Sequence, residues 1–225
     1  MSRAGTDSVL VAAPTYRGKD YALDEYLAAY RAFEWGPRDL LLVDNSRDDG
    51  EYVERLRAAG VPRVLHVDPS NDFEETFTRC WQEILRVATE EEFDFVLSLE
   101  TDVTGPPLLI DTLLNISGYC AAPFVTVTYP YHDGRFGEYY QGLGCLLMNR
   151  LLLEKAVGLC FEPGTPWEGL IEGAVYEVGK HNTHVSLHEY PGLSLRHLDH
   201  PVAGGGIAKE DWQYDEITDP RIVLV

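Results

Sequence analysis

Basic residues are scarce in this chain, and their scarcity disfavours several classes of partner. Lys and Arg number 18 against 37 Asp and Glu among 225 residues, so the formal net charge is −19. A surface of this sign repels nucleic-acid backbones and anionic lipids over long range, although it does not exclude a local basic pocket for a phosphate group. A partner that is itself a polyanion is therefore disfavoured.

Cysteine is also scarce, and long apolar runs are missing. Cys80, Cys120, Cys145 and Cys160 form no CxxC pair, and each lies in or beside an apolar segment. This placement is typical of buried free thiols in a reducing compartment. No stretch approaches roughly 18 uninterrupted apolar residues, and residues 1–8 contain no apolar signal core. We therefore expect a cytoplasmic protein without a membrane span.

Apolar residues, by contrast, make up 45% of the chain, which is enough for one sizeable core in a single domain. Continuous apolar runs predict buried strands at residues 9–13, 39–43, 64–67 and 93–99. Apolar residues at helical spacing predict helices between these strands, at residues 22–34, 52–59 and 73–88. This alternation predicts an α/β fold with a mostly parallel central sheet and helices on both faces.

The second half has a different pattern. Alternating β-branched and aromatic residues predict a strand at 124–129, and shorter apolar runs predict strands at 145–148 and 185–187. Helices are expected at about 150–157 and from Pro166 to Gly179.

The strand at residues 93–99 leads into two carboxylates, Glu100 and Asp102. Burying an unpaired carboxylate costs several kcal/mol, so packing alone does not explain them. If the chain stays extended, both side chains leave the same side, and two hard oxygen ligands suit Mg²⁺ or Mn²⁺ holding a diphosphate. The alternative is a polar turn that Gly105-Pro106-Pro107 closes. Ligands of parallel sheets bind beyond the carboxyl ends of the strands, where these carboxylates lie.

Taken in order, motifs across residues 8–200 resemble the GT-A fold glycosyltransferases, especially the inverting, family 2-like enzymes. Pro14, Thr15 and Tyr16 resemble that family's first-strand loop at the nucleotide. Asp44, in Val-Asp-Asn-Ser, resembles the aspartate that contacts the base. Arg79 stands where the arginine of the family's "ARN" helix motif falls, although Cys rather than Asn follows it.

The motifs that the resemblance connects with catalysis lie further along the chain. Glu100-Thr101-Asp102 is similar to the family's DxD metal site, with Glu in the first position. Trp167-Glu168 precedes a helix as the family's ED motif does, with Trp in place of the first acid. His197 is placed like the family's C-terminal histidine.

The resemblance implies a nucleotide-diphosphate sugar as donor and a divalent metal, Mn²⁺ or Mg²⁺, as cofactor. Asp102, with Glu100 and His197, would hold the metal, and Glu168 would be the general base that activates an acceptor hydroxyl. The nucleotide and substrate contacts that it implies are Pro14, Thr15, Tyr16, Asp44, Arg79, Glu100 and Trp167. The acceptor would be a glycan, a protein or a small molecule, with a nucleic-acid acceptor disfavoured by charge. A homo-oligomer is left open.

The same reasoning divides the chain into a GT-A domain at 1–203 and a C-terminal tail at 204–225. The domain would have a nucleotide-binding half at about 8–103 and an acceptor half at 104–203. Gly204-Gly205-Gly206 can hinge, so the tail is expected to act as a lid or a docking arm.

Several alternatives remain open on the residues alone. Asp44 can form an Asx turn, Arg79 can be a solvated surface residue, and Glu100 can bond the ribose instead of the metal. Two rival functions are a nucleotidyltransferase on a similar sheet and a non-catalytic module that binds nucleotides or glycans. A glycosidase with two carboxylates is a third rival, but it would not need the base-contact loops.

Overall fold

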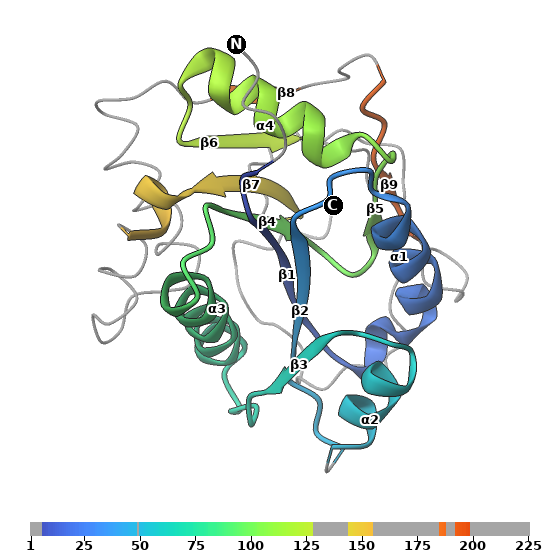
Figure 1. Cartoon of the computed structure of the whole chain (residues 1–225). Coiled ribbons are helices and arrows are strands. Elements are labelled where there is room, and N and C mark those ends of the chain that lie inside the picture. The colour runs from blue at the N-terminus through green and yellow to red at the C-terminus, as the bar shows by residue number, and fades with distance from the viewer. Residues whose placement is uncertain (1–5, 49, 128–143, 155–184, 188–191, 199–225) are drawn as a thin grey trace, which may run out of the picture.

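The computed structural model describes residues 6–48, 50–127, 144–154, 185–187 and 192–198. Within these residues a central sheet has seven strands in the order β3-β2-β1-β4-β7-β6-β8. Figure 1 shows the arrangement of this sheet. Its strands are β1 (Val9–Thr15), β2 (Arg38–Asp44), β3 (Arg63–His66), β4 (Phe95–Leu99), β6 (Phe124–Val127), β7 (Cys145–Asn149) and β8 (Val185–Leu187). A separate two-stranded ribbon pairs β5 (Val103–Thr104) with β9 (Arg196–His197).

The helices cover both faces of the sheet. They are the short 3₁₀ helix η1 (Arg17–Lys19) and the α-helices α1 (Asp20–Ala32), α2 (Glu51–Ala58), α3 (Phe73–Glu90) and α4 (Leu109–Cys120). Side chains of α1, α2 and α4 pack into the core on one face, and those of α3 pack into the core on the other (Figure 1). A further helix begins at Arg150 and is described as far as Glu154.

The central strand β1 shows why the sequence pattern predicts this arrangement. Val9, Val11 and Ala13 belong to the core on the α1 face, while Leu10 and Ala12 belong to the core on the α3 face. A strand buried on both faces needs a continuous apolar run rather than an alternating one. The predicted α/β fold with a mostly parallel sheet is therefore confirmed.

Two features of the second half differ from the expectation or add to it. Strand β7 runs antiparallel to both β4 and β6, which interrupts an otherwise parallel sheet. Helix α4 was not predicted, although Leu109, Ile110, Leu113 and Leu114 recur at helical spacing and are all buried. The predicted helix at 166–179 and the tail at 204–225 lie outside the described residues. Within the described ranges, no helix is both long and apolar enough to cross a bilayer.

Candidate active site

Parallel pairing of β1 with β2 and β4 brings the carboxyl ends of these strands to one edge of the sheet. Hydrogen bonds then tie together the loops that follow. The backbone N–H of Asn45 donates to the carbonyl oxygen of Thr15 at 2.9 Å. The hydroxyl oxygens of Thr15 and Thr101 lie 3.2 Å apart in the interior. The chain segments around Thr15, Asn45 and Thr101 therefore meet at this edge.

The chain turns after β4 and does not stay extended, so that part of the expectation is wrong. The N–H of Val103 donates to the carbonyl of Glu100 at 2.9 Å, which closes a tight turn. The N–H of Glu100 donates to the carbonyl of Gly144 at 3.1 Å, and the N–H of Leu198 donates to the carbonyl of Asp102. Two distant segments thus fix the turn that carries both carboxylates.

Both carboxylates converge on one ammonium group, that of Lys19. Its Nζ lies 3.0 Å from Asp102 Oδ1 and 3.5 Å from Glu100 Oε2. The exposed fractions are 16% for the Lys19 side chain, 8% for Asp102 and 30% for Glu100. Sequence reasoning missed Lys19. The available signal was the rarity of lysine, because the chain has only four and this one follows closely after the first-strand loop.

Charge and burial act on these three groups in different directions. Burial alone would lower the pKa of Lys19, but the neighbouring charges of Asp102 and Glu100 raise it above its ordinary value. The Asp102 pKa is lowered, because Lys19 and His197 outweigh the opposing effect of burial. The Glu100 pKa is raised, mainly by burial and then by the charge of Asp102, against the effect of Lys19. Asp102 is therefore the more strongly ionised of the two carboxylates.

His197 reaches the same cluster through the small ribbon. Antiparallel pairing of β5 with β9 sets Val103 opposite His197. The Nε2 of His197 consequently lies 3.7 Å from Asp102 Oδ2. The structure therefore brings together the three side chains that the sequence suggested as metal ligands, from positions almost a hundred residues apart.

The donor set at this point fits a divalent cation by its chemistry. Two carboxylates and one imidazole are suitable ligands for Mn²⁺, and the carboxylates also suit Mg²⁺. Over the described ranges, no three His, Cys, Asp or Glu side chains are already arranged as a metal cage. The cation that both carboxylates contact in the structure is the ammonium group of Lys19.

Asp44 is fully buried, and its oxygens are directed at protein groups. Its Oδ1 accepts bonds from the N–H and the hydroxyl of Ser46, at 3.0 and 2.6 Å. Its Oδ2 lies 2.7 Å from Nδ1 of His66, a residue that sequence reasoning missed. The Asx-type turn was thus one correct reading of Asp44. Its contact with a nucleobase stays a prediction.

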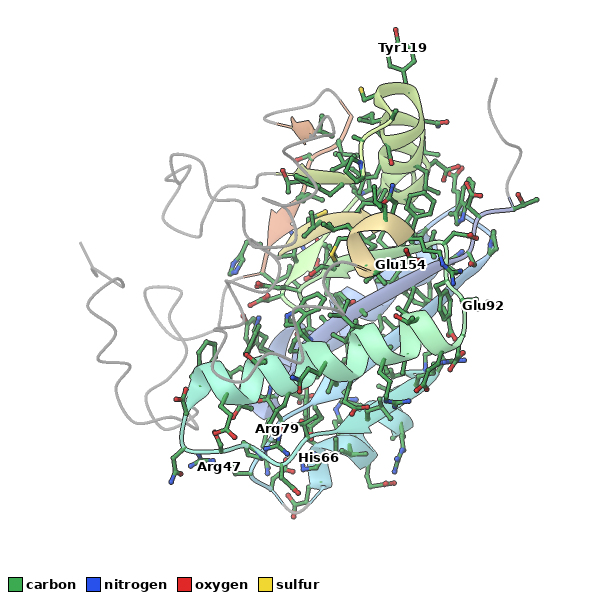
Figure 2. All side chains as sticks on the ribbon, turned by 90° about the vertical axis from the view of Figure 1, so that its left-hand side faces the viewer. Arg47, His66, Arg79, Glu92, Tyr119 and Glu154 are labelled. Atoms are coloured by element: carbon green, nitrogen blue, oxygen red, sulfur yellow. The ribbon has the colours of Figure 1, made fainter. Side chains whose placement is uncertain are left out.

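His66 and Ser46 line a cavity of about 570 Å³ at the ends of β2 and β3. Its other lining residues are Arg47, Gly50, Val53, Glu54, Arg57, Asp68 and Pro69. Arg79 of α3 donates to the carbonyl of Asp68 at 2.8 Å, so it braces the loop that forms one rim. Figure 2 shows Arg47, His66 and Arg79 at this end of the molecule. A phosphate or nucleotide role for Arg79 stays a prediction.

The first-strand loop is shaped by a close approach. A Cβ on Gly18 would lie 2.4 Å from a ring carbon of Tyr16, so only glycine lets the Tyr16 ring lie there without moving. Pro14 and Thr15 complete β1 and pair with Val43 and Asp44. The other two predicted site residues, Trp167 and Glu168, lie outside the described residues.

Comparison with known proteins identifies the fold. The sequence matches no protein-family model and no curated protein. The structure is similar to residues 1–349 of TarS from S. aureus, with a TM-score of 0.59 and 14% identity over 84% of this chain and 60% of that one. It is also similar to glucosyl-3-phosphoglycerate synthase from Mycobacterium tuberculosis in complex with Mn²⁺, UDP-glucose and phosphoglyceric acid. That match has a TM-score of 0.57 and 17% identity, over 87% and 73% of the two chains.

A third similar structure has a different name and a length closer to that of this chain. This is 4-diphosphocytidyl-2C-methyl-D-erythritol synthase, with a TM-score of 0.57 and 13% identity over 87% of this chain and 94% of that one. At such identities the likeness establishes the fold alone, which is the GT-A fold. The chain spans only about 60% of the TarS fragment that it matches.

Proposed function

We propose that this protein is a metal-dependent glycosyltransferase that moves a sugar from a nucleotide-diphosphate donor to an acceptor hydroxyl, with inversion at the anomeric carbon. The observation that carries the proposal is the convergence of Glu100, Asp102 and His197 at the carboxyl edge of a GT-A sheet. Ligands of open parallel sheets bind at this edge. Two of the similar structures contain Mn²⁺ with a nucleotide sugar, UDP-glucose in one and GDP-mannose in the other.

In this proposal each group has a separate task. Asp102, with Glu100 and His197, holds the divalent metal, which when bound neutralises the charge of the leaving diphosphate. The loop at Pro14, Thr15 and Tyr16 would line the nucleotide, Asp44 would contact its base, and Arg79 would have a structural or phosphate role. Trp167 would line the acceptor pocket.

Metal-dependent binding of a nucleoside diphosphate tests the proposal without knowledge of the acceptor. We expect UDP or GDP to bind about tenfold more tightly with Mn²⁺ than with chelator, because the metal screens repulsion between diphosphate and carboxylates. Asp102→Asn should remove most of that gain. Glu83→Gln is the control, because this carboxylate pairs with Arg86 on the exposed surface of α3. Equal affinity in calorimetry with metal and with chelator would contradict the proposal.

Glu168 is proposed as the general base. Glu168→Gln should lower transfer roughly a hundredfold or more while donor affinity changes little, since this side chain would face the acceptor. Glu172 lies about one helical turn further along the predicted helix and is the matched control, so Glu172→Gln should do little. Near-normal turnover of the Glu168 variant would rule out this assignment. So would a donor affinity that falls in step with the rate.

A nucleotidyltransferase is the second candidate function. It is favoured by one observation, because this chain covers 94% of that synthase, against 60% of the TarS fragment and 73% of the phosphoglycerate synthase. Such an enzyme would consume a nucleoside triphosphate and release pyrophosphate. Incubation with triphosphates and a sugar phosphate, followed by a pyrophosphate assay, separates it from a transferase that consumes nucleotide sugars.

A further inference from the structure

The position of Lys19 is built into the fold rather than left to a flexible loop. Lys19 ends η1, and its own N–H donates to the carbonyl of Tyr16 at 2.9 Å. Helix α1 follows directly and is anchored to the two segments that carry the site. Tyr26 donates from its hydroxyl to the carbonyl of Leu99 at 3.2 Å, and Tyr21 donates to the carbonyl of Leu198 at 3.1 Å.

Those two carbonyls belong to the residues next to Glu100 and next to His197 in the sequence. The helix that presents Lys19 is therefore fixed relative to both carboxylates and to the imidazole. The ammonium group is held at the place where the carboxylate oxygens converge, with most of its side chain covered.

A divalent metal would need the lone pairs that this ammonium now uses. Carboxylate oxygens bind Mg²⁺ at about 2.1 Å, whereas the Lys19 Nζ lies 3.0 Å from Asp102 Oδ1. Two cations on the same oxygen repel each other strongly in a site with little solvent. When both carboxylates are ionised, they and the ammonium group together carry a charge of −1. If a divalent cation replaces the ammonium group, the total becomes 0, so the metal neutralises both carboxylates.

We infer that Lys19 is the resident cation of the metal site, and that a divalent metal binds only by displacing its ammonium group from Asp102 and Glu100. The inference rests on the proposed function in taking these carboxylates as the metal ligands. Lys19 therefore weakens the binding of metal alone. A diphosphate that attracts the displaced ammonium recovers this loss, so metal and nucleotide bind cooperatively, and the coupling is reciprocal.

The test is a titration of the full chain with Mn²⁺ in the absence of nucleotide. The concentration of free Mn²⁺ is measured by electron paramagnetic resonance. Lys19→Met keeps the apolar stem and removes the charge, and we expect it to bind Mn²⁺ about tenfold or more tightly than the unmodified protein. Lys19→Gln is a second uncharged variant that can still donate to a carboxylate, should the Met variant fail to fold. Arg17→Met is the matched control. It removes an exposed cation two residues away that pairs with Glu51 and Asp48, and it should change the affinity less than threefold.

The results separate this inference from the proposed function. Weaker or unchanged Mn²⁺ binding by both Lys19 variants overturns the inference, and so does the absence of binding in every protein up to millimolar Mn²⁺. An equal gain in Mn²⁺ affinity for the Arg17 variant also overturns the inference, because the gain would then come from the change in net charge and not from the position of Lys19. Tighter Mn²⁺ binding without any affinity for nucleoside diphosphates supports the inference while rejecting the proposed function. With UDP added, the gain in Mn²⁺ affinity should be larger in the unmodified protein than in Lys19→Met.

Discussion

The ion pair between Lys19 and Asp102 should couple the two residues energetically in the metal-free protein. Coulomb's law gives about 5.5 kcal/mol for unit charges at their 3.0 Å separation and an effective dielectric constant of about 20. Desolvation of both groups opposes much of this attraction. We therefore expect a coupling free energy of about 2 kcal/mol between Lys19→Met and Asp102→Asn. Each single variant should be less stable than the unmodified protein. The double variant should lose less unfolding free energy than the two single variants lose together.

The assay is urea unfolding of the four proteins with chelator present, so that no metal contributes. Arg17 and Glu51 supply a matched surface pair with almost the same separation, 3.1 Å, but with side chains 65% and 75% exposed. Their coupling should not exceed about 0.5 kcal/mol, because water screens exposed pairs. If the Lys19–Asp102 coupling is no larger than that of the surface pair, then the buried cluster is not held by its charges and the electrostatic reasoning fails.

Three further predictions concern the scaffold around the site. Tyr26→Phe should lower the free energy of unfolding by about 1 kcal/mol, because the carbonyl of Leu99 loses a buried donor. A variant as stable as the unmodified protein would argue against that hydrogen bond. Gly60→Ala should cost about 1 kcal/mol, because Gly60 follows the C-terminal end of α2 with a φ of +85°, and unchanged thermal unfolding would contradict this. Burial raises the pKa of Cys80 to about 12 and also raises that of Cys145. Because only the thiolate reacts, neither should be labelled by a disulfide reagent at pH 8 until the protein unfolds, and rapid labelling of the native protein would show that they are accessible.

Apolar patterning was sufficient to predict most of the sheet, because buried parallel strands and their covering helices have distinct periodicities. Whether a buried strand is parallel or antiparallel to its neighbours does not change the apolar pattern of its sequence. Nothing in the apolar run at Cys145–Asn149 distinguishes an antiparallel strand from a parallel one, so the reversal at β7 could not be foreseen. Helix α4 was foreseeable, since Leu109, Ile110, Leu113 and Leu114 fall on one helical stripe, but the preceding prolines directed attention to a turn.

The site was predictable only in part, for a related reason. Topology alone places the loops after β1, β2 and β4 at one edge, so the meeting of Glu100 and Asp102 with the first-strand loop follows from the order of the strands. Which cation lies between the carboxylates depends on how side chains distant in the sequence pack together. Lys19, for example, is more than 80 residues away from Glu100 and Asp102 in the sequence. The contact of His66 with Asp44 also depends on the register between β2 and β3, which periodicity does not fix.

The same contacts bear on the expected division into a nucleotide-binding half at 8–103 and an acceptor half at 104–203. The turn that carries the carboxylates begins in the first half, but its N–H and C=O groups bond to the second, at Gly144 and Leu198. His197 also arrives from the second half, because β9 pairs with β5. A chain ending near residue 104 would lose β7 beside β4 and both anchors of the turn, leaving backbone polar groups without their partners. The position of the candidate metal ligands is therefore set by both halves of the chain together, and the first half alone does not contain the site.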